Sequence, residues 1–331
     1  MCSKTQMGAE MTSKIIGTGS YLPSHVVTND DLAKVVDTDD EWISSRTGIK
    51  ERRIVDNENE ETAYLASMAA KAAIEDAGIS PEEIDLILLA TMSPDQVLPN
   101  VACEVQEAVG AIHAVGMDLN AACSGFVFAL NTAHAYITSG IYKNILVIGA
   151  ETVSKTIDWA DRSTCVLFGD GAGAVVVTAS ESGSYEMVMG ADGRKKDALT
   201  CKSRPMNNLF LKNSGLEYIK MEGQEVFKFA VKTVPECVIQ VMEKAKVTAE
   251  DIKFFVLHQA NQRILSSVAK RLKVSMDKIP MNVDRYGNTS SASIPILLDE
   301  LNKKGLLQEG DKLVLSGFGG GLTWGASLIE W

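Results

Sequence analysis

The sequence lacks any apolar run of the roughly 18–20 residues with which a helix crosses a bilayer. Its first residues, Met1 to Glu10, also lack the apolar core of a secretory signal. They carry an acid but no arginine, unlike most organellar transit peptides. We therefore expect a cytoplasmic protein with no membrane partner. Residues 1–13 are expected to form a disordered extension ahead of the folded chain.

Cysteine is scarce: the 331 residues include six, and no two of them form a C-x-x-C pair. That scatter argues against a disulfide framework and a zinc site, and it fits a reducing compartment. The formal net charge of −11 disfavours nucleic acid as the main partner, although a basic face can still form locally. With 46% hydrophobic residues, the chain can bury the core of two packed domains or of one large two-lobed unit.

Apolar strands alternate with amphipathic helices along the chain, which indicates an α/β layered fold. The order of these elements is repeated. In each half, a helix, an acidic turn and a strand come first, and a pair of strands follows later. These segments are 62–90, 143–149 and 171–177 in the first half, and 224–257, 311–317 and 323–329 in the second.

A repeat of this length predicts two similar lobes that face each other rather than a solenoid. We expect an N-terminal half over 14–180 and a C-terminal half over 216–331. The segment 181–215 is polar and contains glycine, serine and asparagine, so we expect it to be the linker between the halves.

Cys123 lies where an apolar strand at 115–119 turns into a helix whose apolar spacing begins at Phe126. Unpaired backbone N–H groups and the positive end of the helix dipole lie at a helix start, and both favour a thiolate. The small residues around the cysteine leave room for a substrate. Free cysteine is also among the most buried residue types, so simple packing is the alternative.

Polar residues in the second half stand at positions that suit chemistry. His258 directly follows a buried strand, at the carboxyl end where α/β folds place their sites. Asn288 lies in a turn that opens an apolar helix. A glycine run at 319–321 allows backbone N–H groups to approach a ligand closely.

Trp42 and Arg46 lie four residues apart on a short acidic helix that Thr38 could cap, so they share one face. Such a pair can stack on a nucleobase and hold a phosphate. An ordinary cation–π pair on the surface fits the same spacing.

With these residues identified, the chain resembles the β-ketoacyl-acyl-carrier-protein synthase III family, thiolase-fold condensing enzymes that start fatty acid synthesis. The resemblance extends from about Lys14 to Trp331. Each motif is a weak signal alone, but six in the same order and at matching separations are specific. They are D-T-D-D-E-W-I with R-T-G-I, A-A-C-S-G-F, F-G-D-G-A-G-A, H-Q-A-N-Q-R-I, Y-G-N-T-S-S-A-S-I-P and G-F-G-G-G-L-T-W-G.

The resemblance implies two pseudo-repeated α/β halves in an α-β-α-β-α arrangement, and a homodimer. It implies that Cys123 attacks an acyl-CoA, with acetyl-CoA the expected primer, and that the N–H groups of Cys123 and Gly320 form the oxyanion hole. His258 and Asn288 would then hold the thioester carbonyl of malonyl-acyl-carrier protein as carbon dioxide leaves. No metal or redox cofactor is implied.

The resemblance also assigns binding residues. Those expected at the adenine and phosphates of CoA are Thr38, Trp42, Arg46 and Arg162, and those along the pantetheine tunnel are Gly223, Phe227, Ala260 and Asn261. Those expected to bind the acyl-carrier protein are Gln259, Ala260, Asn261, Gln262, Arg263, Lys270 and Arg271. Arg263 and Lys270 are seven apart and share a helix face, for which simple solvation is the alternative. In the family, the residue at the position of Leu98 closes the acyl pocket of the partner subunit. A leucine there does not decide between acetyl, branched and longer primers.

Three other functions fit parts of the pattern. A thiolase needs a second cysteine near the C-terminal glycine run, but no cysteine follows Cys237. A cysteine hydrolase could use His258 as the base for the thiol. A non-catalytic acyl-CoA binder would not require Cys123, His258 and Asn288 together.

Overall fold

The computed structural model describes residues 11–331. The expected extension at 1–13 therefore lies largely outside the described residues. Its last two residues already belong to the first strand, β1, which spans Thr12–Tyr21. Within the described chain, no helix combines the length and the apolar character that crossing a membrane requires.

Two sheets form the framework. The first has the strand order β1-β7-β6-β4-β5, in which β4 is parallel to β5 and β6 while β7 is antiparallel to β1 and β6. The second has the order β11-β12-β13-β8, in which only β11 and β12 are parallel. The strands beyond β1 are β4 (Leu86–Ala90), β5 (Val115–Leu119), β6 (Asn144–Glu151), β7 (Gly171–Ser180), β8 (Tyr185–Ala191), β11 (Ile252–Leu257), β12 (Lys312–Gly319) and β13 (Thr323–Glu330).

The sheets repeat one topology, because β4-β6-β7-β1 in the first sheet corresponds to β11-β12-β13-β8 in the second. Strand β8 therefore belongs to the second half, although it lies inside the segment 181–215 that we expected to be a linker. It is an edge strand whose side chains are mostly half-buried, so its sequence carries little of the apolar signal of the central strands. The longest irregular stretch of that segment follows β9.

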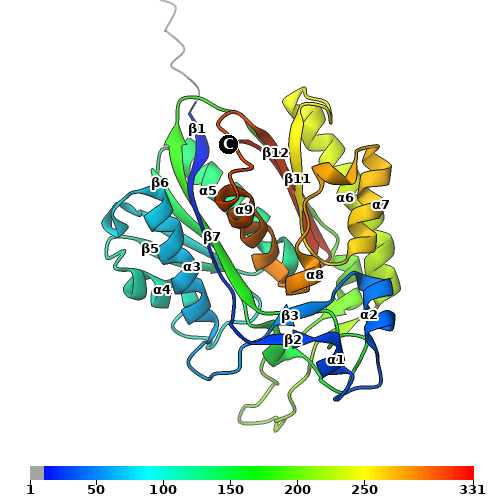
Figure 1. Cartoon of the computed structure of the whole chain (residues 1–331). Helices are drawn as coiled ribbons and strands as arrows, with labels where there is room; N and C mark the ends of the chain where they lie inside the picture. The colour runs from blue at the N-terminus through cyan, green and yellow to red at the C-terminus, as the bar shows by residue number, and fades with distance from the viewer. Residues whose placement is uncertain (1–10) are drawn as a thin grey trace, which may run out of the picture.

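Helices form three layers around the two sheets, as Figure 1 shows. Helices α5 (Gly125–Thr138) and α9 (Ser293–Lys303) lie between the sheets. Helices α3 (Thr62–Ala77) and α4 (Val101–Val109) cover the outer face of the first sheet. Helices α6 (Gly223–Ala245) and α7 (Gln262–Leu272) cover the outer face of the second. The expected α-β-α-β-α arrangement is confirmed.

Short elements complete the chain. Helix α2 (Asp40–Thr47) begins after Asp39, whose carboxylate accepts the Trp42 N–H, so the cap is Asp39 rather than the expected Thr38. The others are α1 (Asn29–Leu32), α8 (Val283–Tyr286), β2 (Val26–Thr28), β3 (Glu51–Arg53), β9 (Leu199–Thr200), β10 (Lys220–Met221), η1 (Pro81–Glu83), η2 (Ala122–Ser124), η3 (Val153–Thr156), η4 (Gly193–Ala198), η5 (Met276–Lys278) and η6 (Ser290–Ala292).

Two glycines of the first sheet let the second half approach closely. A Cβ on Gly149 would overlap the carbonyl oxygen of Ser291, and a Cβ on Gly173 would collide with the backbone at Pro295 and Ile296. The start of α9 therefore packs directly against β6 and β7. This contact brings η6 beside η2 at the centre of the molecule.

Candidate active site

Cys123 lies in η2, the turn that joins β5 to α5. Ala122 has φ 47°, a left-handed conformation that non-glycine residues rarely adopt, and it turns the chain sharply into the helix. The side chain of Cys123 is buried, with 7% of its surface exposed. The nucleophile expected at a strand-to-helix turn is therefore at the start of a central helix, between the two sheets.

Two cavities meet at Cys123. The narrow one has a volume of about 100 Å³ and the wider one about 340 Å³. Cys123, Phe168 and Leu199 line both. Cys123 is therefore one of the three residues at the boundary between the two cavities.

The narrow cavity gathers residues that lie far apart in the sequence. His258 and Asn288 line it together with Cys123. The four residues expected along the pantetheine tunnel line it as well, namely Gly223, Phe227, Ala260 and Asn261. Sequence reasoning thus named seven residues that the fold brings to one cavity.

His258 follows β11, where its N–H donates to the Ser316 carbonyl at 2.8 Å. Its Nδ1 lies 2.7 Å from Ser293 Oγ, which also accepts the Gln259 N–H at 3.3 Å. The hydroxyl hydrogen of Ser293 is then free to be donated to Nδ1, which leaves the single N–H hydrogen of the neutral imidazole on Nε2. Burial lowers the pKa of His258 to about 3, so the ring is neutral at physiological pH.

Asn288 is oriented by its neighbour in the chain. Its Oδ1 accepts the Ser290 N–H at 2.9 Å, so the Nδ2 amino group is the end that remains for a ligand. Its backbone bonds to Leu167 and Gly169 at 2.8 and 3.1 Å and fixes the turn. His258 and Asn288 therefore present two uncharged N–H donors to one cavity.

The ionisation of Cys123 differs from the expectation. Burial raises the pKa of its thiol to about 12, and this effect outweighs the lowering by the Ser290 hydroxyl and by its own backbone N–H. The negative charge of Glu151 raises it further. The helix start was expected to favour a thiolate, but in the substrate-free site desolvation of the sulfur dominates, so the thiol keeps its proton.

Two family models match the chain, both described as 3-oxoacyl-[acyl-carrier-protein] synthase III. One covers residues 117–193, and the other, a C-terminal model, covers 242–331. A β-ketoacyl-[acyl-carrier-protein] synthase III from Clostridium acetobutylicum is 56% identical over 321 residues, 96% of this chain and 98% of that protein. The chain belongs to the β-ketoacyl-acyl-carrier-protein synthase III family.

Solved structures agree. The synthase III of Aquifex aeolicus has a TM-score of 0.90 and 49% identity, and the match covers 96% of this chain and 100% of that one. The synthase III of Thermus thermophilus has a TM-score of 0.90 and 42% identity, with 96% and 98% covered. Membership of the synthase III family excludes the thiolase alternative that the sequence analysis considered.

The residues expected at the CoA entrance of a synthase III lie together. The guanidinium carbons of Arg46 and Arg162 lie 4.6 and 5.0 Å from the centre of the Trp42 ring. Asn261 donates to the Arg46 carbonyl at 3.1 Å, which connects this cluster to the narrow cavity. Among residues 11–331, the buried Thr38 hydroxyl has no hydrogen-bond partner.

The residues expected to bind the carrier protein do not all reach the surface. Gln259 is completely buried: its Nε2 donates to the Leu257 carbonyl at 2.8 Å, and its Oε1 accepts the Asn282 N–H at 3.1 Å. It cannot contact a docked protein, so this assignment is wrong. Gln259 instead supports the turn between β11 and α7.

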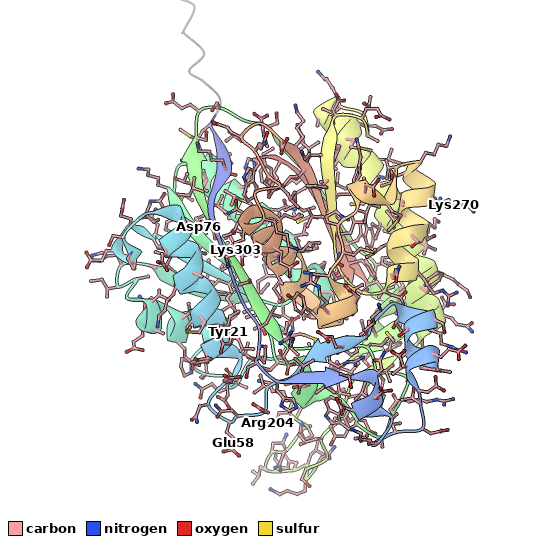
Figure 2. All side chains as sticks on the ribbon, in the orientation of Figure 1. Tyr21, Glu58, Asp76, Arg204, Lys270 and Lys303 are labelled. Atoms are coloured by element: carbon pink, nitrogen blue, oxygen red, sulfur yellow. The ribbon has the colours of Figure 1, made fainter. Side chains whose placement is uncertain are left out.

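Helix α7 carries the exposed cations. Lys270 projects outward from it, as Figure 2 shows. Arg263, seven positions earlier, is also exposed and lies 5.8 Å from the ring centre of Phe227. Arg271 is already engaged, because it donates to the Val231 carbonyl at 3.2 Å and lies 3.9 Å from Glu236. Gln262 is exposed at the start of the helix and packs against Gly48.

Of the two remaining expected residues, Gly320 lies at a cavity and Leu98 lies on the surface. Gly320 lines the wide cavity with Cys123. A Cβ on its neighbour Gly319 would lie 2.7 Å from the Cys123 nitrogen, so only glycine fits between this strand and Cys123. Leu98, in the loop between β4 and α4, is 82% exposed and does not line either cavity in its own chain.

Sequence reasoning missed Glu151, the last residue of β6. It is completely buried beside Cys123 and Ser290. An acid at the carboxyl end of a strand that is otherwise apolar is the signal that could have identified it.

The burial of Cys123 predicts a slow, pH-dependent reaction with iodoacetamide. Because only the thiolate reacts, the rate should rise about tenfold per pH unit from pH 7 to beyond 9. Peptide mass spectrometry after timed quenching measures it, with the exposed Cys103 of α4 as the internal reference. A rate that levels off below pH 8 would show that the helix start, not burial, controls this thiol.

Proposed function

We propose that the protein condenses a short acyl-CoA with malonyl-acyl-carrier protein. The products are a β-ketoacyl-acyl-carrier protein, CoA and carbon dioxide, and acetyl-CoA is the expected primer. The observation that carries this proposal is the meeting of two cavities at Cys123, with His258 and Asn288 as uncharged donors in the narrow one. Curated members of the family carry the corresponding name.

In the first half-reaction, the pantetheine of acyl-CoA occupies the narrow cavity, and Cys123 attacks its thioester carbon. The carbonyl oxygen gains negative charge, which the N–H groups of Cys123 and Gly320 stabilise. The bond to the CoA sulfur then breaks. Overall, the proton of Cys123 is exchanged for the acyl group, so free CoA leaves as a thiol and the acyl group extends into the wide cavity.

In the second half-reaction, malonyl-acyl-carrier protein uses the same narrow cavity. Nε2–H of His258 and Nδ2–H of Asn288 donate to its thioester carbonyl oxygen. Loss of carbon dioxide leaves the electron pair as an enolate, which these donors stabilise. The enolate carbon attacks the acyl-Cys123 carbonyl, and the Cys123 sulfur leaves and recovers a proton. A carbanion formed by decarboxylation needs no base, which suits a histidine that burial keeps neutral.

The CoA nucleotide would lie at the cluster of Trp42, Arg46 and Arg162. The indole offers a face for the adenine, and the guanidinium groups on it can pair with phosphates. The unpaired Thr38 hydroxyl provides a further polar contact. No metal or cofactor enters this scheme, and that part of the scheme stays a prediction.

Acetyl transfer and decarboxylation should separate by mutation. After incubation with acetyl-CoA, the intact protein should gain one acetyl group, and Cys123→Ser should gain none. His258→Ala and Asn288→Ala should still be acetylated but should lose about 100-fold or more in malonyl decarboxylation, because each removes a donor to the enolate. Intact mass and carbon dioxide release measure the two steps.

Each outcome of this test bears on the proposal. If every short acyl-CoA, including branched and longer primers, fails to modify Cys123, no acyl-enzyme forms and the proposed function falls. If His258→Ala and Asn288→Ala lose both steps alike, the division of roles is wrong. A cysteine hydrolase would release free acid from acyl-CoA without consuming malonyl carrier.

Docking of the acidic carrier protein on α7 is the second part of the proposal. Lys270→Glu should raise the KM for malonyl-acyl-carrier protein about tenfold at low salt, and the difference should shrink as salt screens the charges. Arg271→Glu should have a smaller effect, because Glu236 already offsets its charge. Lys71→Glu on α3 makes the same charge change on the opposite outer layer and should leave KM unchanged. An unchanged KM for malonyl-acyl-carrier protein in both Lys270→Glu and Arg271→Glu would contradict docking on α7.

The exposed edge of the first sheet supports a homodimer as the third part. Strand β5 has a neighbour on one side only, and Val115 at its start is 46% exposed. Val97 and Leu98 in the preceding loop are 70% and 82% exposed. A second copy would cover this apolar surface and let Leu98 bound the partner's wide cavity.

Sedimentation equilibrium at micromolar concentration should therefore give twice the chain mass. Leu98→Ala should raise kcat/KM for longer acyl-CoA primers relative to acetyl-CoA, because it removes side-chain volume from the partner's cavity. Ile239→Ala, on the outer helix α6 and 40% exposed, should leave that ratio unchanged. A monomer, or the same primer ratio in Leu98→Ala, contradicts the assignment.

A further inference from the structure

Arg52, the middle residue of β3, is completely buried, and uncharged groups hold its guanidinium. It donates to the Val27 carbonyl at 3.2 Å, to Asn29 Oδ1 at 2.9 Å and to the Val166 carbonyl at 2.8 Å. Burial lowers the pKa of Arg52 to about 10, so the side chain is still a cation at physiological pH. A buried cation held by neutral oxygens loses hydration that no opposite charge offsets. Stability alone therefore does not explain this arginine.

The shortest of the three bonds holds a wall of the narrow cavity. Val166 begins the segment 166–169, in which two residues line that cavity. The backbone of this segment also forms two hydrogen bonds with the backbone of Asn288, at 2.8 and 3.1 Å. Arg52 thus holds the segment that fixes Asn288, at the position just before the first of these two bonds.

Two glycines allow the stem of Arg52 to pack against the same turn. A Cβ on Gly169 would lie 3.2 Å from the Cβ of Arg52, and a Cβ on Gly287 would lie 3.4 Å from it. Gly287 directly precedes Asn288 and has φ 63°, a conformation that suits glycine. The stem therefore contacts both segments that meet at Asn288, while the guanidinium bonds to one of them.

The bond from Arg52 to Asn29 leads to the proposed CoA entrance. Asn29 is buried, and its Nδ2 donates to Asp40 Oδ1 and to the Ile49 carbonyl, both at 2.8 Å. These bonds hold both ends of α2, and they do not require Arg52. The 166–169 segment has no such duplicate, because among residues 11–331 no other side chain hydrogen-bonds to it. Loss of the arginine should therefore disturb the Asn288 turn more than α2.

Arginine suits this position because its planar fork can bond to two segments at once. The guanidinium reaches Asn29 and Val166 with different nitrogens, and a single ammonium group offers no comparable fixed geometry. A hydrogen bond from a cation to a carbonyl is also stronger than one from a neutral donor. The segment beside Asn288 is held correspondingly firmly.

We propose that Arg52 is a positioning residue for Asn288 in malonyl decarboxylation, which rests on the function proposed above. Arg52 acts through the 166–169 segment and contacts no substrate atom. By holding that segment, it fixes the point at which Nδ2–H of Asn288 meets the thioester carbonyl oxygen. Acyl transfer to Cys123 uses the N–H groups of Cys123 and Gly320 instead, so it does not depend on Arg52.

The test uses Arg52→Met, which removes the hydrogen bonds and the charge but keeps a long, unbranched side chain. Malonyl decarboxylation at saturating substrate should fall about tenfold, because a small displacement of a donor has an effect of this order. Acetylation of Cys123 should stay within about threefold, since its donors lie on other segments. Carbon dioxide release and rapid-quench intact mass measure the two rates, at a temperature at which thermal unfolding shows each variant to be folded.

Arg53→Met is the matched control. Arg53 is the next residue of β3 and is half-buried, and its guanidinium lies 3.8 Å from Glu51. This variant makes the same change of charge one position away, but it leaves the bond to Val166 intact. Both rates should stay within about twofold of those of the unmodified protein, because a partly exposed ion pair contributes little.

A double variant distinguishes positioning from a general structural role. In the Asn288→Ala background, Arg52→Met should slow decarboxylation no further, because the side chain that it positions is already absent. A further tenfold loss in the double variant would show that Arg52 acts independently of Asn288, and this would overturn the proposal.

The remaining outcomes are also decisive. If Arg52→Met does not fold, Arg52→Lys replaces it, and its loss should be about threefold and should again disappear with Asn288→Ala. Equal slowing of acetylation and decarboxylation, or no change in either, would overturn the assignment of Arg52. Failure of the unmodified protein to release carbon dioxide from malonyl-acyl-carrier protein would instead reject the proposed function.

Discussion

Removal of the reacting groups from water is the constraint on which the site depends. Cys123, the proposed nucleophile, lies at the start of a helix that is packed between two sheets, so its sulfur loses the solvation that a thiolate needs. The same burial keeps His258 neutral, which makes it a hydrogen-bond donor without making it a competing base. Fixed N–H dipoles must then stabilise the developing negative charge that water would otherwise solvate. The donors around the two cavities are arranged to provide these dipoles.

Much of this arrangement could be predicted from the sequence, because it depends on local patterns. A buried strand followed by a polar residue identifies the carboxyl edge of a sheet, and His258, selected on that ground, lines the same cavity as Cys123. The repeated order of helix, acidic turn and strand predicted two lobes, and the matching sheets confirm them. The tunnel residues came from the family resemblance, and the structure brings them to one cavity.

The remainder depends on contacts that no local pattern contains. Strand β8 pairs with β13, which lies more than a hundred residues later, so its segment resembled a linker. Gln259 lies within a polar motif, yet its amide is consumed by Leu257 and Asn282. The ionisation of Cys123 depends on the depth of its burial, which only the packed halves determine. Glu151 receives hydrogen bonds from Ser290 and Ser291 of η6 only because the two halves pack together.

The internal repeat extends to the two turns that build the site. Helices α5 and α9 occupy equivalent central positions, and each begins with a short 3₁₀ turn whose first residue has a left-handed backbone, Ala122 with φ 47° and Ser290 with φ 50°. The turns contact each other. In the first half the next residue is Cys123, the expected nucleophile. In the second half, the N–H of Ser290 donates to Oδ1 of Asn288 at 2.9 Å and orients its amide. One strained turn, used twice, thus positions the expected nucleophile and orients an amide donor that lines the same cavity.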